Sequence, residues 1–304
     1  MDLKIAWWNC HLSPPSTQAK PKGASTEFLL IIQGLLNLKI DILCLCEVND
    51  NDCEAIKEYL AFASIEKPEL SKFSVKSLFS KRGNSIDDFA LLYNREKITI
   101  EGEAVALNKK TDITEKYLKV GNRLQLTLPG KLTLWLFMCH WQSRGTYHED
   151  AQIRSELAAA LRSSVNEILD NSPDALIAVC GDFNDEPFNR SVQMDLKASR
   201  DIHYVRRRKK SLFNPFWRLM GVTDLVETPH HPVGTCYTSD SIHLTHWKTF
   251  DQIILSSGFL LDDWKFSGEG AEIIHYIRPE NPTSTWHEIS DHYPILCSLK
   301  RVSQ

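Results

Sequence analysis

The sequence predicts an α/β protein in which two mixed β-sheets pack face to face and helices cover their outer sides, a four-layered α/β sandwich. Two observations favour this fold. Short apolar runs rich in β-branched and aromatic residues recur along the chain, which is typical of buried strands. Segments with helical apolar spacing lie between these runs in both halves of the 304 residues. Strands that alternate with helices indicate a layered α/β fold, although the alternation alone also allows a single doubly wound sheet.

Three segments carry apolar residues at the spacing of an amphipathic helix. Residues 27–38 (EFLLIIQGLLNL) and 52–63 (DCEAIKEYLAFA) lie on either side of an apolar run at 41–48 (DILCLCEV). Residues 151–169 (AQIRSELAAALRSSVNEIL) show the clearest pattern. We therefore expect helices in these three segments.

The remaining apolar runs are too short for helices and are expected to be strands. Several of them end in a polar or charged residue. The expected strands are residues 5–9, 41–48, 89–95, 97–107, 122–128, 131–141, 175–183, 250–256 and 292–299. A hairpin framed by residues 234–235 and 245–247 is expected just before the strand at 250–256.

Composition points to one globular domain. The chain is 42% hydrophobic and 24% charged, so it can bury a large core and is unlike disordered chains. No low-complexity linker interrupts it, and we expect a single domain over residues 1–304 whose two similar halves meet near residue 145. The net charge of −4 argues against a protein that coats nucleic acid nonspecifically. An enzyme needs only a local basic rim, because a bound metal supplies charge at its site.

The cysteines and the N-terminal residues indicate the cellular compartment in which the protein is expected. Several of the eight cysteines lie inside apolar runs, as expected of buried, reduced thiols, and no paired CxxC motifs indicate zinc. The N-terminal residues lack the apolar region of a signal peptide, and no apolar stretch is long enough to span a membrane. We therefore expect a cytoplasmic protein with no membrane partner, and leave protein partners open.

Carboxylate, amide and imidazole side chains recur where an apolar strand begins or ends. Loops at strand ends commonly carry the functional groups of α/β proteins. A single Asp at such a position is usually a turn or cap residue, but here a whole set shares the placement. The set is Asn9, Glu47, His140, Asp182, Asn184, Asp251, Asp291 and His292.

This set suits the hydrolysis of a phosphodiester. Mg²⁺ takes oxygen ligands and is commonly held by one or two carboxylates. The reaction also needs a base for water and donors for the phosphate oxygens, which histidine–carboxylate pairs, Asn and Arg can supply. Zinc fits less well because the His and Cys spacings are wrong. The chain has no GxSxG elbow, and neither a Walker A motif nor GxGxxG.

Six motifs resemble, in order, those of the endonuclease/exonuclease/phosphatase superfamily. They are WNCHLS, LCLCEV, CHWQSR, GDFNDEP, FDQIILS and SDHYPI, and the resemblance runs from about residue 4 to residue 299. The superfamily contains DNase I-like nucleases, apurinic/apyrimidinic endonucleases, sphingomyelinases, inositol-phosphate 5-phosphatases and deadenylases. The resemblance implies a DNase I-like sandwich and a Mg²⁺-dependent phosphodiesterase, with Mn²⁺ as an alternative cation.

The resemblance also implies roles for individual residues. In the metal group, Glu47 is the principal ligand, Asn9 helps to hold the metal and phosphate, and Asp291 is a direct or outer ligand. In the catalytic group, Asp182 lies near the attacking water, Asn184 donates to a phosphate oxygen, and His292 is a base or phosphate clamp oriented by Asp251.

The same resemblance extends to a second histidine and to basic residues. His140 resembles the second active-site histidine of the DNase I-like branch, and Asp88 falls where that histidine's carboxylate partner is expected. Arg123 resembles a strand arginine near the phosphate. Arg144 is either a phosphate-binding residue or a salt-bridged surface residue, because a planar guanidinium suits both.

A basic run at residues 206–210 is the remaining feature of interest. Arg206, Arg207 and Arg208 open it, and aromatic residues follow. It is either a solvated loop or an arm that contacts phosphates of a nucleic acid. Because it follows GDFNDEP in sequence, we expect it on the substrate side of the sandwich.

One departure from the family pattern concerns the substrate. The endonuclease motif often reads W-N-x-N-G, whereas His11 stands here at the position of the second Asn. This departure weakens the likeness to the abasic-site branch and leaves the chain closer to bacterial members. We expect a nuclease acting on DNA or RNA. The alternative is an enzyme for a small phosphoester, such as an inositol phosphate, a phospholipid headgroup or a nucleotide.

Overall fold

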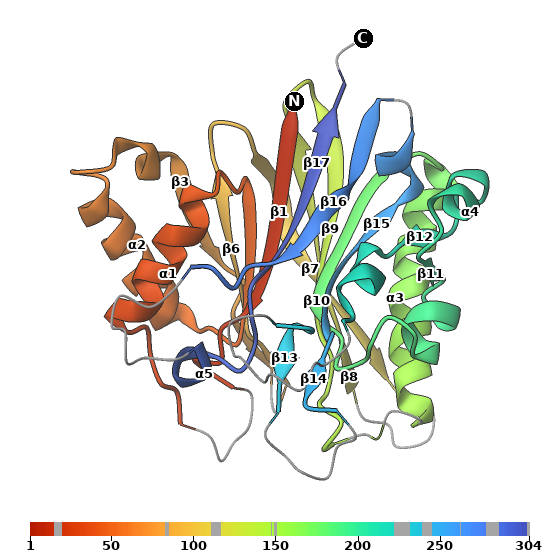
Figure 1. The fold of residues 1–304 in the computed structure, drawn as a ribbon, viewed down its shortest axis with the longest axis horizontal. Coiled ribbons are helices and arrows are strands. Elements are labelled where there is room, and N and C mark those ends of the chain that lie inside the picture. Colours follow the sequence, from red (N-terminus) through yellow and green to blue (C-terminus); the bar gives the residue numbers. More distant parts are fainter. Residues whose placement is uncertain are drawn as a thin grey trace.

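Two β-sheets pack face to face, with helices on their outer sides (Figure 1). The computed structural model describes residues 1–14, 20–82, 85–110, 117–146, 148, 151–221, 232–238, 245–261, 263–277 and 286–302. Helices α1 (Thr26–Asn37) and α2 (Asp50–Ala63) lie outside the first sheet, and α3 (Gln152–Asn171) lies outside the second. The predicted four-layered sandwich is therefore confirmed.

The first sheet has the strand order β16-β17-β1-β2-β6-β3. At its centre β1 (Asp2–Asn9) runs parallel to β2 (Ile42–Cys46) and antiparallel to β17 (Ile295–Arg301). Outward from these lie β6 (Phe89–Asn94), β3 (Phe73–Ser77) and β16 (Trp264–Ile273). Strands β1 and β2 are parallel neighbours, so their C-terminal residues meet at one edge of the sheet.

The second sheet has the order β11-β12-β15-β10-β9-β8-β7. Parallel strands β9 (Leu132–His140) and β10 (Leu176–Asp182) form its centre, and β15 (Asp251–Ser256) runs antiparallel to β10. The other members are β7 (Thr99–Lys110), β8 (Tyr117–Leu128), β11 (Ala198–Ser199) and β12 (Leu212–Phe213). Because β15 is antiparallel to β10, its first residue lies beside the last residue of β10.

Short elements complete the described part of the chain. The short helices are α4 (Ile202–Arg207) and α5 (Trp286–Ile289), with 3-10 turns at Pro68–Lys72, Pro215–Leu219 and Ser257–Leu260 and one π-helical turn at Ser191–Asp195. Two small hairpins pair β4 (Ser80–Arg82) with β5 (Ser85–Asp87) and β13 (Cys236–Tyr237) with β14 (Trp247–Lys248). The second hairpin is the one expected before residue 250.

Local sequence accounts for the main helices. Ser25 caps α1 by accepting from the backbone N–H of Phe28. Asn49 and Asp52 form a reciprocal capping box at the start of α2, which satisfies two backbone donors that the helix itself cannot pair. Each helix then buries one apolar face against its sheet, which supplies most of the stability of a helix of this length.

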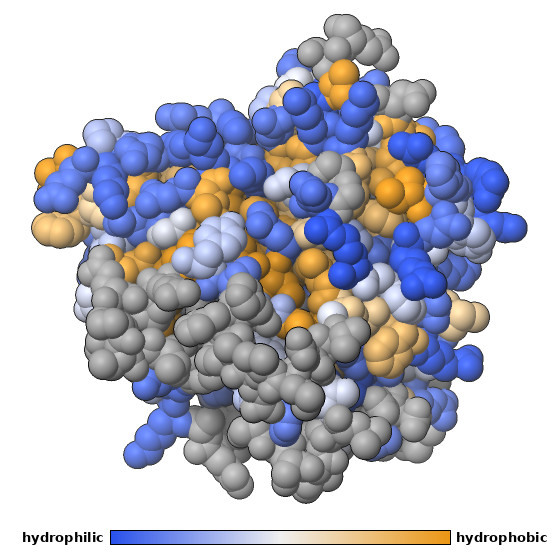
Figure 2. Space-filling view, in the orientation of Figure 1, coloured by the Kyte–Doolittle hydropathy of each residue, from blue (hydrophilic) through white to orange (hydrophobic). Residues whose placement is uncertain are grey.

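Strand alternation divides the core into two clusters. In β10, Ile177 and Val179 pack under α3, whereas Ala178 and Cys180 face the first sheet, as the period of two requires. All eight cysteines are buried and unpaired, as expected. In the view of Figure 2, hydrophobic residues show between the layers and hydrophilic residues cover the periphery. No helix among the described residues is long and apolar enough to cross a bilayer.

The expected division into halves near residue 145 is wrong. The first sheet combines residues 2–94 with the C-terminal strands β16 and β17, and the second sheet takes strands from residues 99–256. Strand β17 pairs with β1 along six residue pairs from Asp2↔Lys300 to Trp7↔Ile295. The chain therefore changes sheets after β6 and again before β16, a choice set by long-range strand pairing that local periodicity does not encode.

Gly181 should be required for this packing. A Cβ on Gly181 would lie 2.5 Å from the carbonyl oxygen of Cys139 and 2.8 Å from its Cβ, on the strand directly beside β10. We expect Gly181→Ala to lower the free energy of unfolding by about 1–3 kcal/mol, measured by denaturant titration. Gly145→Ala is the control, because its Cβ would meet only Ser143 at an ordinary 3.7 Å. Equal stability of the two variants would contradict this account.

Candidate active site

The ends of the central strands bring the predicted site residues together at one end of the sandwich. Asp182, the last residue of β10, pairs with His140 on β9 and with Asp251 on β15. Across the interface, the last residue of β1, Asn9, pairs with Cys46, so Glu47 follows beside it. This end carries the β13–β14 hairpin and α5 in Figure 1.

His292 and Asp251 form the first predicted histidine–carboxylate pair. The Nδ1 atom of His292 lies 2.7 Å from Oδ2 of Asp251. The other carboxylate oxygen of Asp251 accepts from the indole N–H of Trp7 at 2.8 Å, which links the first sheet to the second. Burial opposes the charged form of His292, but the charge and hydrogen bond of Asp251 act together with other neighbouring groups, including Asp182, and hold the pKa of His292 well above its usual value.

His140 and Asp88 form the second predicted pair, with 3.1 Å between Nδ1 and Oδ2. Lys119 lies 2.6 Å from the other oxygen of Asp88. Burial opposes ionisation of Asp88, yet the charges of Lys119 and His140 hold its pKa well below the usual range. Burial likewise opposes a charged His140, but Asp88 outweighs it and raises the pKa of His140. Both carboxylates thus favour imidazolium on their partners.

The two histidines converge on Asp182. The Nε2 atom of His292 lies 3.8 Å from Oδ2 of Asp182, and Nε2 of His140 lies 4.0 Å from the same oxygen. Burial and the charge of Asp251 raise the pKa of Asp182 above its usual value, against the opposing charges of the histidines. Two imidazole N–H groups and one basic carboxylate therefore face a common point.

Glu47 and Asn9 lie next to this point. The side-chain amide of Asn9 donates to Oε1 of Glu47 at 3.1 Å and to Oδ2 of Asp182 at 3.2 Å. Its oxygen accepts the backbone N–H of His11 at 3.1 Å. One lone pair of this oxygen is left for a cation, so the expectation that Asn9 helps to hold the metal stays a prediction. Its amide separates and orients two carboxylates.

The chemistry of the donors fits a hard divalent cation. Oε2 of Glu47 is buried and has no hydrogen-bond partner among the described residues, and an orphaned carboxylate oxygen is costly unless a cation or water meets it. Glu47 also has a left-handed φ of 56°, which is uncommon outside glycine and is often retained at functional sites. An oxygen ligand of this kind suits Mg²⁺ or Mn²⁺.

Asp291 is paired with a residue that the sequence reading did not assign. Nδ1 of His11 lies 2.9 Å from Oδ1 of Asp291. Burial opposes ionisation of Asp291, but the hydrogen bond from His11 and the charge of His292 lower its pKa. His11 therefore stands beside a predicted metal residue, and its place in the WNCHLS motif was the available signal.

Two groups among the described residues have ligand atoms close enough for a metal ion, Asp182–Asp251–His292 and Cys236–Asp291–His292. In the first, His292 is hydrogen-bonded to Asp251 at 2.7 Å, and Asp182 lies 3.8 Å from the other nitrogen of His292. In the second, burial raises the pKa of Cys236 to about 11, and a thiol is a soft ligand that does not suit Mg²⁺ or Mn²⁺. Glu47, whose Oε2 has no partner among the described residues, is the better candidate for the metal ligand. Asp291 is the second carboxylate that the family motifs indicate.

Asn184 and Arg144 lie on the loops beside the cluster. The backbone N–H of Asn184 donates to Oδ1 of Asp182 at 2.8 Å, and its side-chain amide donates to the carbonyl of Trp141 at 2.9 Å. Nε of Arg144 donates to the carbonyl of Asn184 at 2.9 Å, and its guanidinium lies over the ring of Phe250. Both residues hold the loop that orients Asp182, and direct phosphate contact by either stays a prediction.

Arg123 is not brought to the site. Its guanidinium lies 3.3 Å from Oγ of Ser164 and 3.4 Å from Glu167, both on α3, on the outer side of the second sheet. The register of β7 and β8 shifts near Val120, so Lys119 faces Asp88 whereas Arg123 faces α3. A shift of one residue places every following side chain of the strand on the opposite face of the sheet. The sequence alone does not show where such a shift occurs.

The expected place of Arg206, Arg207 and Arg208 is wrong. Helix α4 ends within this run and β12 follows it, pairing with Leu255 and Ser256 at the end of β15 remote from Asp251. At about 3.3 Å per residue, that end lies about 17 Å along the strand. Nε of Arg206 is bonded to the carbonyl of Leu260 at 2.7 Å. The basic run therefore lies at the opposite end of the sandwich (Figure 1).

Sequence reasoning missed three residues of the site. From the sequence, Trp7 and Lys119 received no role, and His11 was noted only as a departure from the family motif. Each acts on a carboxylate of the cluster, as described above. Only His11 had a sequence signal, because an indole in a strand or a lysine in a strand does not by itself indicate which group it will meet.

The comparisons with known proteins agree with this geometry. The model of the Endonuclease/Exonuclease/phosphatase family matches residues 31–276. No curated protein matches the chain. A family protein from Bacteroides thetaiotaomicron superposes with a TM-score of 0.62 at 16% identity, covering 98% of each chain. The human Nocturnin catalytic domain with bound sulfate gives 0.56 at 18% identity, covering 99% of this chain and 95% of that one.

A third solved structure, D. rerio TDP2 complexed with single strand DNA product, gives a TM-score of 0.57 at 14% identity and covers 98% of this chain and 99% of that one. At these identities the likenesses concern the fold, which is the DNase I-like sandwich. The family model covers most of the chain, and it includes the strands that carry Glu47, His140, Asp182 and Asp251. The chain therefore belongs to the endonuclease/exonuclease/phosphatase family.

Proposed function

We propose that this protein hydrolyses phosphodiester bonds in nucleic acid with the help of Mg²⁺. Its superfamily consists of metal-dependent phosphoester hydrolases. The observation that carries the proposal is the meeting of two histidine–carboxylate pairs on Asp182, beside the unpartnered Oε2 of Glu47. A phosphate between the two imidazoles would meet N–H donors on both sides.

The roles follow from charge and position. Asp182 accepts the proton of the attacking water, because its raised pKa makes it a stronger base than an ordinary carboxylate. His292 and His140, held protonated by Asp251 and Asp88, donate to the phosphate oxygens on which charge develops. The amide of Asn9 lies between Asp182 and Glu47 and donates to both. Asp182 can therefore act on the water while Glu47 holds the cation.

The cation would be held by Glu47, with Asp291 as a further ligand. When bound, it would polarise the phosphoryl group and stabilise the leaving oxygen. His11 would then orient Asp291 through the bond between them.

The support for a nucleic-acid substrate comes from a protein of the same fold. D. rerio TDP2, which shares the fold, is seen with a single strand DNA product. One observation favours the alternative of a small phosphoester: Arg123 and the run from Arg206 to Arg208 point away from the cluster. A small substrate would need few cations beyond the two histidines and Arg144.

We expect hydrolysis to require a divalent cation, and a comparison of substrates identifies the class that the enzyme cleaves. We expect cleavage of single-stranded DNA, plasmid or RNA with Mg²⁺ or Mn²⁺, and loss of activity with excess chelator that added Mg²⁺ restores. Gel analysis and release of p-nitrophenol from bis-p-nitrophenyl phosphate measure the two substrate types. Cleavage of the small diester or an inositol phosphate without cleavage of any nucleic acid would favour the alternative. Full activity in chelator would contradict the metal-dependent mechanism.

A further inference from the structure

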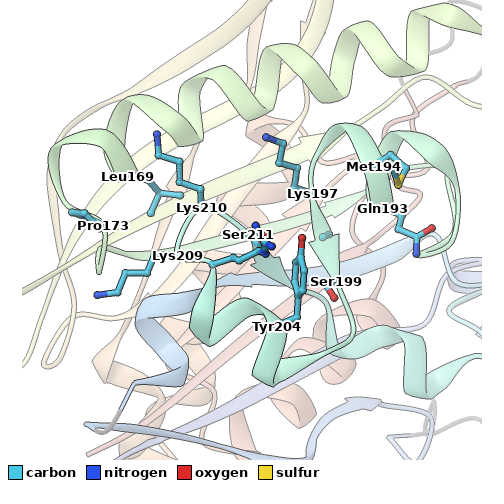
Figure 3. A pocket seen from close by; sticks show the side chains of 12 residues that line it. Leu169, Pro173, Gln193, Met194, Lys197, Ser199, Tyr204, Lys209, Lys210 and Ser211 are labelled. Carbon is cyan, nitrogen blue, oxygen red and sulfur yellow. The ribbon is translucent and has the colours of Figure 1, made fainter.

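A pocket lies at the end of the sandwich opposite the active site. It has a volume of about 720 Å³ and is formed by the C-terminal end of α3, the π-helical turn, α4 and the basic run (Figure 3). This volume lies within the range of small-molecule sites. The catalytic residues do not line it, so the proposed hydrolysis leaves the pocket without a role.

The charged residues among the described residues that line the pocket are all cations. Lys197, Arg208, Lys209 and Lys210 contribute to its wall. Lys209 is paired with Asp174 at 2.6 Å, and Lys210 is paired with Asp170. Within the described part of the chain, Lys197 and Arg208 have no such carboxylate partner. Two cations are therefore available to a ligand, in a chain whose net charge is −4.

A buried arginine fixes the wall from behind. Arg162 on α3 is only 5% exposed, and its guanidinium donates to the carbonyls of Leu196 and Lys210. These bonds join the two loops that carry Lys197 and the basic run. Nε of Arg162 has no partner among the described residues, and burial lowers its pKa to about 10. The charge of Asp170 offsets only part of the cost of burying this cation, and an anion in the adjacent pocket would offset more of it.

Aromatic and apolar surface lies next to these cations. The guanidinium of Arg208 stacks over the ring of Tyr204, with 5.2 Å between Cζ and the ring centroid. Tyr204 is 40% exposed, and Met194 on the π-helical turn is 64% exposed. Figure 3 shows Tyr204 standing in the pocket between the lysines and Met194. A flat ring can stack here while a phosphate reaches the cations.

We infer that this pocket binds a nucleotide phosphate, with the phosphate at Lys197 and Arg208 and the base against Tyr204 and Met194. The ligand is either a free mononucleotide or one nucleotide of a strand, since both present the same groups. Lys197 has a left-handed φ of 61°, a conformation uncommon for a residue with a side chain. The bonds from Arg162 to the flanking residues hold this loop in place.

Binding is tested on the full chain in excess chelator, so that hydrolysis is not needed. Calorimetric titrations use AMP, inorganic phosphate and a short single-stranded DNA. We expect the double variant Lys197→Ala/Arg208→Ala to bind AMP at least about tenfold more weakly, since one charge-assisted hydrogen bond is worth about that factor. Arg207→Ala is the matched control, because it removes an exposed cation of the same run that does not line the pocket.

Tyr204→Ala should weaken AMP binding while leaving phosphate binding unchanged. A matching loss of DNA affinity in the double variant would identify a strand as the source, and a loss for AMP alone would identify the free nucleotide. Equal AMP affinities for the parent, the double variant and Arg207→Ala would overturn the inference. AMP binding no tighter than phosphate, and unaffected by Tyr204→Ala, would also overturn it. Parent-like hydrolysis of bis-p-nitrophenyl phosphate by each variant with Mg²⁺ shows that the fold is intact.

Discussion

Glu47→Gln is expected to lower turnover by on the order of 10³-fold or more while the protein stays folded. Glutamine keeps an oxygen that can accept the Asn9 amide, but it removes the negative charge that the buried Oε2 offers to a cation. A catalytic cation supplies several kcal/mol of transition-state stabilisation, and each factor of ten in rate corresponds to about 1.4 kcal/mol. Steady-state rates at saturating Mg²⁺ measure the loss.

Two further measurements separate metal loss from unfolding. Titration with Mn²⁺ followed by electron paramagnetic resonance should show weaker binding to Glu47→Gln than to the parent. The control is Glu54→Gln, which removes an exposed carboxylate that is paired with Lys57 on the same helix, and it should keep parent-like rates and Mn²⁺ affinity. Near-parent turnover by Glu47→Gln at saturating Mg²⁺ would remove Glu47 from the metal site.

The second large effect should come from the His292–Asp251 pair. We expect His292→Gln to lower kcat by about 10²–10⁴-fold, the range that a positioned acid–base group contributes. Asp251→Asn should produce a loss of similar order, because the amide no longer stabilises a charged imidazole, although its oxygen can still accept from Trp7. Because the two residues act as one unit, the double variant should be little worse than His292→Gln alone.

Steady-state kinetics of the two single variants and the double variant test this coupling. His203→Gln is the control, since His203 lies exposed on α4, away from the cluster. Losses that multiply in the double variant would show that Asp251 and His292 act separately. A parent-like kcat for His292→Gln would exclude His292 from the chemistry.

Local sequence determined the secondary structure that carries the site. Periods of two and of 3.6 residues depend on near neighbours in the chain, so the long helices and the central strands were predictable. The polar residues that end these strands were visible for the same reason. Strands β3 and β16 were missed because polar and charged residues interrupt them, as in FSVKS and WKFSGEGAEI.

The two histidine–carboxylate pairs came from the family motifs, and their geometry is confirmed by hydrogen bonds of 2.7 and 3.1 Å. Spacing alone could not have paired Asp88 with His140 or Asp251 with His292. Each pair joins different elements, and a contact between distant residues depends on which strands become neighbours.

Sequence by itself thus determined the central strands, the long helices and the chemical types at the strand ends. Tertiary structure alone decided that β17 lies beside β1, that Asn9 spaces two carboxylates and that His11 meets Asp291. It also placed the basic run at the far end, where β12 pairs with the end of β15. The physical reason is that a side chain's direction is fixed by strand register and sheet order, which arise from pairing between residues far apart in the chain.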